Sequence, residues 1–201
     1  MNLPNKLSIL RVILVPVFVA VLVVPYEIGL FTEHESLIRI IAAAVFIITA
    51  LTDMLDGKIA RKYNLITDFG KFIDPLADKF MVFGALIAML YVFENIQPIF
   101  IWAALIVIFR ELAITSLRLL ISKSSGKVVA AAWLGKVKTV TQVICIVTIL
   151  VEPIIMPFMP TLFPFQIPLL SLITIIAMTV MTLWSGIDYF RSYWDVLDPT
   201  K

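Results

Sequence analysis

Four aspartates are the residues of this chain whose type and spacing could do chemistry. Asp53 and Asp56 are three positions apart, and Asp74 and Asp78 are four apart, beside long apolar segments. Residues at these spacings share one face of a helix. A charged side chain costs about 2.5–3.5 kcal/mol at the centre of a membrane helix, so a cation must compensate the cluster. Because carboxylate oxygens bind Mg²⁺ or Mn²⁺, the aspartates predict a site for two divalent ions that handles phosphates.

The residues around the aspartates fit the same chemistry. The full string reads D-x-x-D-G-x-x-A-R, eight residues, then G-x-x-x-D-x-x-x-D. Gly57 leaves room beside the carboxylates for a ligand, and Arg61 supplies a fixed positive charge that suits a phosphate. In the simpler interpretation the aspartates only form interfacial salt bridges with nearby basic residues, which are Lys58, Arg61, Lys71 and Lys79.

Composition places these aspartates in a membrane protein. The 201 residues are 61% hydrophobic, and the mean hydropathy of +1.04 excludes an ordinary soluble domain. Most charge-free stretches are shorter than the roughly 20 apolar residues that span a bilayer, so charged residues must complete one end of each helix. We expect one all-α, polytopic domain over residues 1–201. Its six transmembrane helices are predicted at 7–25, 37–61, 72–93, 97–121, 134–151 and 166–190.

Lysines and arginines predict the orientation of these helices. With a cytoplasmic N-terminus, 15 of the 16 basic residues fall inside and only Arg39 falls outside. Glu152 and His34 are then expected in outer loops, with His34 solvated rather than bound to a metal. We therefore expect a multi-pass protein of the cell membrane with both termini cytoplasmic, no nucleic-acid partner, and a polar, water-filled cavity open to the cytoplasm.

At the aspartate string the sequence resembles the CDP-alcohol phosphotransferase family, and every fixed position of that family's pattern is present. The resemblance implies a homodimeric enzyme with six helices that displaces CMP from a CDP-linked lipid with an alcohol. It implies that Asp53, Asp56 and Asp74 bind the two metal ions. Asp78 would complete the second metal site and act as the general base. The residues that it implies for holding the CDP group are Gly57, Arg61 and Thr67.

Other segments resemble the members of this family whose acceptor is glycerol 3-phosphate, namely 3–11, 70–79, 110–118 and 135–139. An acceptor with a phosphate needs cations, and four lie near the inner ends of the fourth and fifth helices: Arg110, Arg118, Lys136 and Lys138. They could instead be ordinary loop charges, and Arg110 could pair with Glu111 or an aspartate. Near the N-terminus, Asn5 and Ser8 either contact the nucleotide lipid or only cap the first helix.

The expected reaction converts CDP-diacylglycerol and glycerol 3-phosphate into phosphatidylglycerophosphate and CMP. The nearest alternative keeps this chemistry with another acceptor, such as inositol phosphate, serine or a phospholipid. A membrane prenyltransferase also binds a diphosphate through aspartates, but with a different spacing. A cation transporter would need charges deep in several helices, whereas here the middle and outer parts of the helices are expected to be apolar.

Overall fold

Helices make up nearly all of the described structure. The computed structural model describes residues 2–63, 67–125, 133–156, 161–162 and 167–194. The helices are α1 (Leu3–Glu27), α2 (Phe31–Lys62), α3 (Asp68–Val92), α4 (Gln97–Ser125), α5 (Trp133–Ile155) and α6 (Leu169–Ser192). Two short strands, β1 (Thr161–Leu162) and β2 (Ile167–Pro168), pair antiparallel before α6. All six helices are long and apolar enough to cross a membrane, which confirms the all-α, polytopic prediction.

The helices differ from the prediction by a few residues at both ends. At the inner end, α1 and α3 each begin four residues earlier than predicted, and α4 ends four residues later. The second helix begins at Phe31 rather than at 37, so exposed His34 lies within α2, not in a loop. His34 has non-helical angles, φ −124° and ψ 25°, which mark a kink there. The last helix begins after Pro168 rather than at 166, because the fixed φ of proline suits a residue that precedes a helix.

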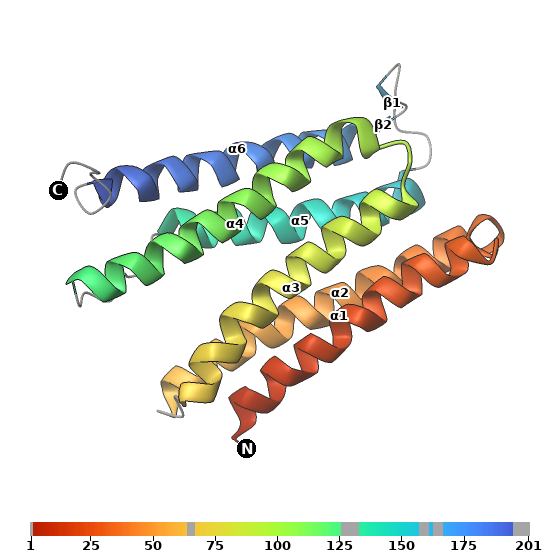
Figure 1. Cartoon of the computed structure of the whole chain (residues 1–201). Coiled ribbons are helices and arrows are strands. Elements are labelled where there is room, and N and C mark those ends of the chain that lie inside the picture. The colour runs from red at the N-terminus through yellow and green to blue at the C-terminus, as the bar shows by residue number, and fades with distance from the viewer. Residues whose placement is uncertain (1, 64–66, 126–132, 157–160, 163–166, 195–201) are drawn as a thin grey trace.

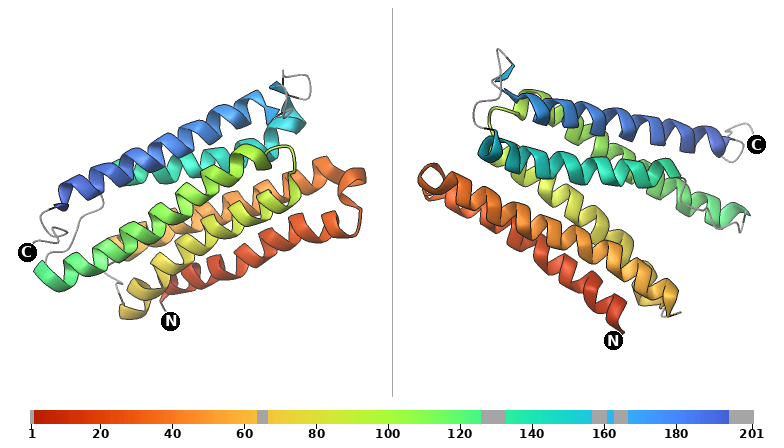
Figure 2. Two further views of the ribbon diagram at one scale, coloured as in Figure 1. Left: turned by 45° about the horizontal axis from the view of Figure 1, so that its top comes forward. Right: turned by 180° about the vertical axis from the view of Figure 1, so that it is seen from behind.

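The helices form two groups of three. Each of α2 and α3 packs along α1, while α4 and α5 each pack against α6. Contacts of α2 with α5 and of α3 with α4 join the groups (Figure 1). The two further views show the same division (Figure 2). In Figure 1, α1, α3 and α5 begin, and α2, α4 and α6 end, at the same end of the bundle, which we call the inner end.

A close approach of α1 to α3 aligns the two helices. A Cβ atom added at Gly84 would lie 2.6 Å from Cγ1 of Val15, so only glycine allows the helices to pack this tightly. On the same buried face of α1, nearer the inner end, lie Ser8 and Arg11. The packing therefore directs two polar side chains of α1 at the beginning of α3.

Two buried charged residues, Arg39 and Glu152, lie toward the outer end of the bundle, opposite the inner end. Nε of Arg39 donates to Glu35 at 2.7 Å. Glu152, predicted in an outer loop, instead lies inside α5 and is only 4% exposed. Its carboxylate accepts from the amides of Leu170 at 2.8 Å and Ser171 at 2.6 Å, and so caps the beginning of α6. The prediction for Glu152 was wrong because a cap contact lets a buried carboxylate satisfy free helix amides. The expectation that the outer parts of the helices are apolar was also wrong.

Candidate active site

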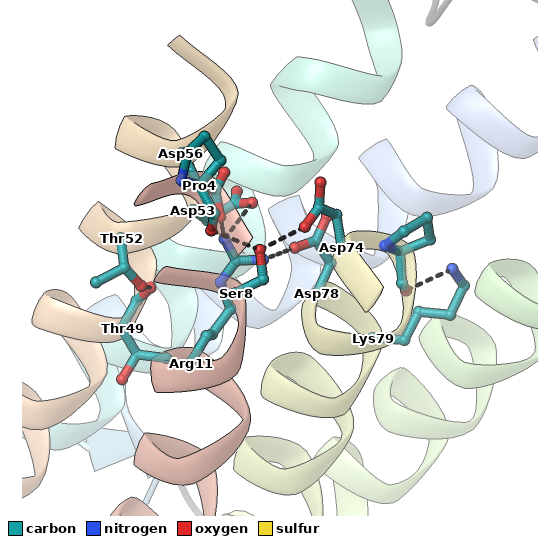
Figure 3. A network of polar contacts seen from close by, with 11 residues as sticks. Pro4, Ser8, Arg11, Thr49, Thr52, Asp53, Asp56, Asp74, Asp78 and Lys79 are labelled. Carbon is teal, nitrogen blue, oxygen red and sulfur yellow. Dashed lines mark hydrogen bonds and ion pairs between the residues drawn. The ribbon is translucent and has the colours of Figure 1, made fainter. Parts of the chain in front are cut away.

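The guanidinium of Arg11 lies among the aspartates at the inner end (Figure 3). Asp53 and Asp56 come from α2, and Asp78 comes from α3. Nη2 of Arg11 is 3.1 Å from Oδ1 of Asp53 and also pairs with Asp56, while Nη1 pairs with Asp78. The Arg11 side chain is completely buried. An arginine from a distant part of the chain thus compensates three of the four carboxylates.

The fourth carboxylate contacts α1 through a hydroxyl. Ser8 donates to Oδ1 of Asp74, and its hydroxyl also lies 3.1 Å from the carbonyl oxygen of Pro4 (Figure 3). Ser8 is fully buried at this position. Ser8 therefore belongs to the aspartate cluster and does not cap α1.

Asn5 is tied to the beginning of α3. Its Oδ1 accepts from the hydroxyl of Thr67 at 3.1 Å, and the Thr67 oxygen accepts from the amide of Gly70 at 3.0 Å. The cap of α1 is Asn2, whose side chain accepts from the amide of Asn5 at 3.3 Å. The alternative that Asn5 or Ser8 caps α1 is therefore wrong. Asn5 and Thr67 form one polar unit beside the cluster.

Of the four basic residues named in the salt-bridge interpretation, the structure describes the side chain of Lys79 alone. Nζ of Lys79 donates to the carbonyl oxygen of Pro75 at 2.9 Å (Figure 3). The side chains of Lys58, Arg61 and Lys71 lie outside the described residues. The predicted role of Arg61 therefore stays a prediction. Gly57 directly follows Asp56 on α2.

The donor set fits a divalent metal in its chemistry. The four aspartates offer only oxygen ligands, which Mg²⁺ and Mn²⁺ prefer. They come from the inner ends of two neighbouring elements, α2 and α3. Among the described residues, no three acidic, histidine or cysteine side chains gather closely enough to hold an ion. Arg11 lies between the carboxylates instead, and a metal ion would reach all four of them only if its guanidinium moved aside.

A cavity of about 360 Å³ connects the cluster with the second group of helices. Asp53, Asp74 and Asp78 line one side of it. Four cations of α4 and α5 line it as well, and these are the residues predicted for the acceptor: Arg110, Arg118, Lys136 and Lys138. Acidic and basic residues that are far apart in the sequence therefore face one cavity.

Glu111 divides the four cations into two pairs. Its Oε1 accepts from Lys138 and lies 3.2 Å from Nη1 of Arg110. The guanidinium of Arg118 lies 5.5 Å from the centre of the Tyr189 ring, and Lys136 is exposed. Neither Arg118 nor Lys136 pairs with a carboxylate in the described part of the chain. These two cations are thus the ones most available to a phosphate.

Arg11 was predicted only as one of the inner-end charges, and its place among the aspartates was not predicted. A signal for it was present in the register of α1, because Arg11 lies on the same helical face as Val15, Phe18 and Leu22. A basic residue on an otherwise apolar, buried face needs an acidic partner on a neighbouring helix.

The chain matches known proteins over nearly its whole length. Residues 1–184 match the family described as CDP-alcohol phosphatidyltransferase. The chain is 39% identical over 199 residues to the CDP-diacylglycerol--glycerol-3-phosphate 3-phosphatidyltransferase of Bacillus subtilis (strain 168), covering 98% of this chain and 97% of that protein. It is 34% identical over 204 residues to the protein of the same name from Yersinia enterocolitica, covering 99% of each. The chain therefore belongs to the CDP-alcohol phosphatidyltransferase family, whose members in general depend on a divalent metal.

Proposed function

We propose that the protein transfers the phosphatidyl group of CDP-diacylglycerol to glycerol 3-phosphate, giving phosphatidylglycerophosphate and CMP. The observation that carries this proposal is the cavity with aspartates on one side and cations on the other. The donor contains a diphosphate and the acceptor a second phosphate, so the reaction needs both kinds of site. The Bacillus subtilis relative named for these substrates aligns over nearly the whole chain.

The donor belongs at the aspartate side. Asp53, Asp56 and Asp74 would hold two Mg²⁺ or Mn²⁺ ions, with Asp78 completing the second site. Bound ions would neutralise the diphosphate and the charge on the departing CMP. The polar groups that border the cluster would orient the nucleotide lipid, and these are Asn5, Ser8, Gly57, Arg61 and Thr67. The hydrogen bonds of Asn5 with Thr67 and of Ser8 with Asp74 support this placement.

The acceptor phosphate belongs at the cation side. Arg118 and Lys136 would bind it directly, because no described carboxylate neutralises them. Arg110 and Lys138, held by Glu111, would add a positive wall. Charge-assisted hydrogen bonds of this kind contribute about 1.5–3 kcal/mol each.

Asp78 would start the reaction as the general base. Its side chain lines the cavity and is 49% exposed, so it can reach an incoming hydroxyl. Asp78 takes the proton of the C1 hydroxyl, and the oxygen attacks the phosphorus that carries diacylglycerol. The bond from that phosphorus to the oxygen of CMP breaks, and CMP leaves with its electron pair. In the structure Asp78 pairs with Arg11, which must release it for this step.

The setting in the membrane follows from the same residues. The cavity lies at the end of the bundle where α1 begins and α6 ends, and the positive-inside rule supports the proposal that both termini and the active site are cytoplasmic. The glycerol phosphate can then arrive from water while the lipid donor arrives from the inner leaflet. We also propose a homodimer, which the resemblance at the aspartate string implies.

One assay tests the proposed function. Purified protein with CDP-diacylglycerol and Mg²⁺ is offered glycerol 3-phosphate, inositol phosphate, serine or a phospholipid separately, and CMP release is measured. Release with glycerol 3-phosphate alone is expected. Release with a different acceptor would overturn the acceptor assignment, and release with none would overturn the donor assignment.

A further inference from the structure

Gln142 is a polar residue on the cavity wall to which the mechanism above gives no role. It lies on α5, lines the cavity, and is 1% exposed. Its Nε2 atom is buried and has no hydrogen-bond partner. Buried polar groups in proteins are nearly always paired, so an unpaired amide at the edge of a cavity indicates a partner that the cavity receives.

The position of Gln142 relates it to the acceptor rather than to the donor. It is four positions after Lys138 and three after Thr139, and both of these residues also line the cavity. One further turn along α5 lie buried Cys145 and Ile146, which do not line the cavity. Gln142 is thus the last polar side chain before the apolar interior on this wall, one turn beyond the cations.

The amide suits an uncharged hydroxyl. It carries two N–H donors and one carbonyl acceptor, and a rotation by half a turn exchanges them, so it can donate to a hydroxyl or accept from it. Glycerol 3-phosphate offers three polar groups. Its phosphate suits the cations and its C1 hydroxyl suits Asp78, which leaves the C2 hydroxyl without a partner on either side.

We propose that Gln142 hydrogen-bonds the C2 hydroxyl of the acceptor and thereby makes the enzyme specific for a three-carbon acceptor that carries this group. The inference rests on the proposed function. A third contact point has a further consequence, because C2 is the chiral centre of glycerol 3-phosphate. Contacts with the phosphate and the C1 hydroxyl alone would accept either enantiomer, whereas a contact with the C2 hydroxyl distinguishes them.

The test compares acceptors that differ only at C2. Glycerol 3-phosphate is compared with 3-hydroxypropyl phosphate, which lacks the C2 hydroxyl, and kcat/KM for CMP release is measured with each. Wild-type protein should prefer glycerol 3-phosphate by about tenfold or more, because the analogue leaves the buried amide unpaired. Gln142→Met keeps the length of the side chain without its polar atoms. This variant should have a lower kcat/KM for glycerol 3-phosphate. Its kcat/KM for the analogue should stay within about threefold of the wild-type value, so that the preference is lost.

A matched control removes another unpaired polar atom outside the cavity. Thr182 on α6 is fully buried, its hydroxyl has no partner, and it does not line the cavity. Thr182→Val should retain the wild-type preference. If Gln142→Met lowers kcat/KM by the same factor with both acceptors, Gln142 is a packing residue and the proposal is wrong.

Two further measurements keep the test decisive. Gln142→Asn withdraws the amide by one methylene and should also lose the preference, which covers the case in which the methionine variant does not fold. Wild-type protein that uses both acceptors equally well would overturn the proposal without any variant. Wild-type protein that releases CMP with neither acceptor, but does so with serine or a phospholipid, would instead overturn the proposed function on which it rests.

Discussion

The hydroxyl of Thr67 lies 3.1 Å from Oδ1 of Asn5, a residue 62 positions earlier in the chain. The same oxygen of Thr67 accepts from the amide of Gly70 and so caps α3. The Thr67 side chain therefore caps the helix that carries Asp74 and Asp78, and it also hydrogen-bonds that helix to α1.

Replacing Thr67 should reveal this double role. Thr67→Val removes the cap and the bond to Asn5, and loss of an N-cap alone costs about 0.5–2 kcal/mol. We expect a lower Tm in detergent and a higher KM for CDP-diacylglycerol. Thr67→Ser keeps the hydroxyl and is the matched control, with values near wild type. An unchanged Tm in the valine variant would contradict the structural role of this hydroxyl.

Metal removal should stop the reaction. Excess EDTA is expected to abolish CMP release, and added Mg²⁺ or Mn²⁺ should restore it, because the carboxylates cannot bind a diphosphate without cations between them. CMP release is measured before and after chelation in the same sample. Full activity in excess chelator would rule out the metal-dependent mechanism.

Arg11 should compete with metal ions for the aspartates. Removing one partner of a buried ion pair typically costs about 3–5 kcal/mol, so Arg11→Met should be strongly destabilised without metal. Mg²⁺ should raise its Tm by more than it raises that of wild type, since the carboxylates are then free to bind the ion. The measurement is the difference in Tm with and without Mg²⁺.

The control for Arg11 is Arg39, another buried arginine with an acidic partner, which does not line the cavity. Arg39→Met should lose stability while its response to Mg²⁺ stays that of wild type. Equal Mg²⁺ responses in Arg11→Met and wild type would show that the guanidinium does not compete with the ion.

Asp78 and Asp53 should respond differently to the same substitution. Asp78→Asn keeps an oxygen ligand but loses the base, so kcat should fall about 10²–10⁴-fold while metal-dependent binding of CDP-diacylglycerol persists. Asp53→Asn should lose that binding as well. Turnover and lipid binding are measured side by side for both variants. A kcat for Asp78→Asn within a few-fold of wild type would assign the base to another group.

Substitutions of the four cations should have different effects, depending on whether the cation pairs with Glu111. Arg118→Ala and Lys136→Ala are expected to raise KM for glycerol 3-phosphate by roughly tenfold to a hundredfold, with little change in KM for CDP-diacylglycerol. Lys138→Met should in addition lower Tm, because it leaves the partly buried Glu111 carboxylate with Arg110 alone. If KM for the acceptor is unchanged in both alanine variants, Arg118 and Lys136 do not bind its phosphate.

The sequence was most informative where spacing along one helix carried the signal. The pairs Asp53 with Asp56 and Asp74 with Asp78 could be placed on helix faces because each lies within a single turn. The number and rough extent of the membrane helices followed from apolar length. Contacts between distant elements could not be found in this way, because the distance of Arg11 from Asp53 depends on how α1 packs against α2.

Helix ends were the weakest part of the prediction. The second helix was predicted to begin at 37, beyond His34, and the fifth was predicted to end at 151, which put Glu152 into a loop. In the structure Arg39 pairs with Glu35 inside α2, and Glu152 caps α6 from within α5. A charged residue can therefore lie inside a membrane helix when a group on a neighbouring turn or helix pairs with it. A partner on another helix cannot be identified from the sequence of one segment.

The division of the bundle into two groups has a consequence for how new specificities can arise. The four aspartates of the cluster and the polar residues bordering them lie in the first group, before α4, whereas the four cations proposed for the acceptor and Gln142 lie in α4 and α5. The residues proposed for the nucleotide lipid and those proposed for the acceptor phosphate and C2 hydroxyl thus lie in separate, consecutive stretches of the chain. Selectivity for a new alcohol could therefore be engineered by recombining the second stretch alone, with the aspartate-bearing half, including the proposed base Asp78, left as it is.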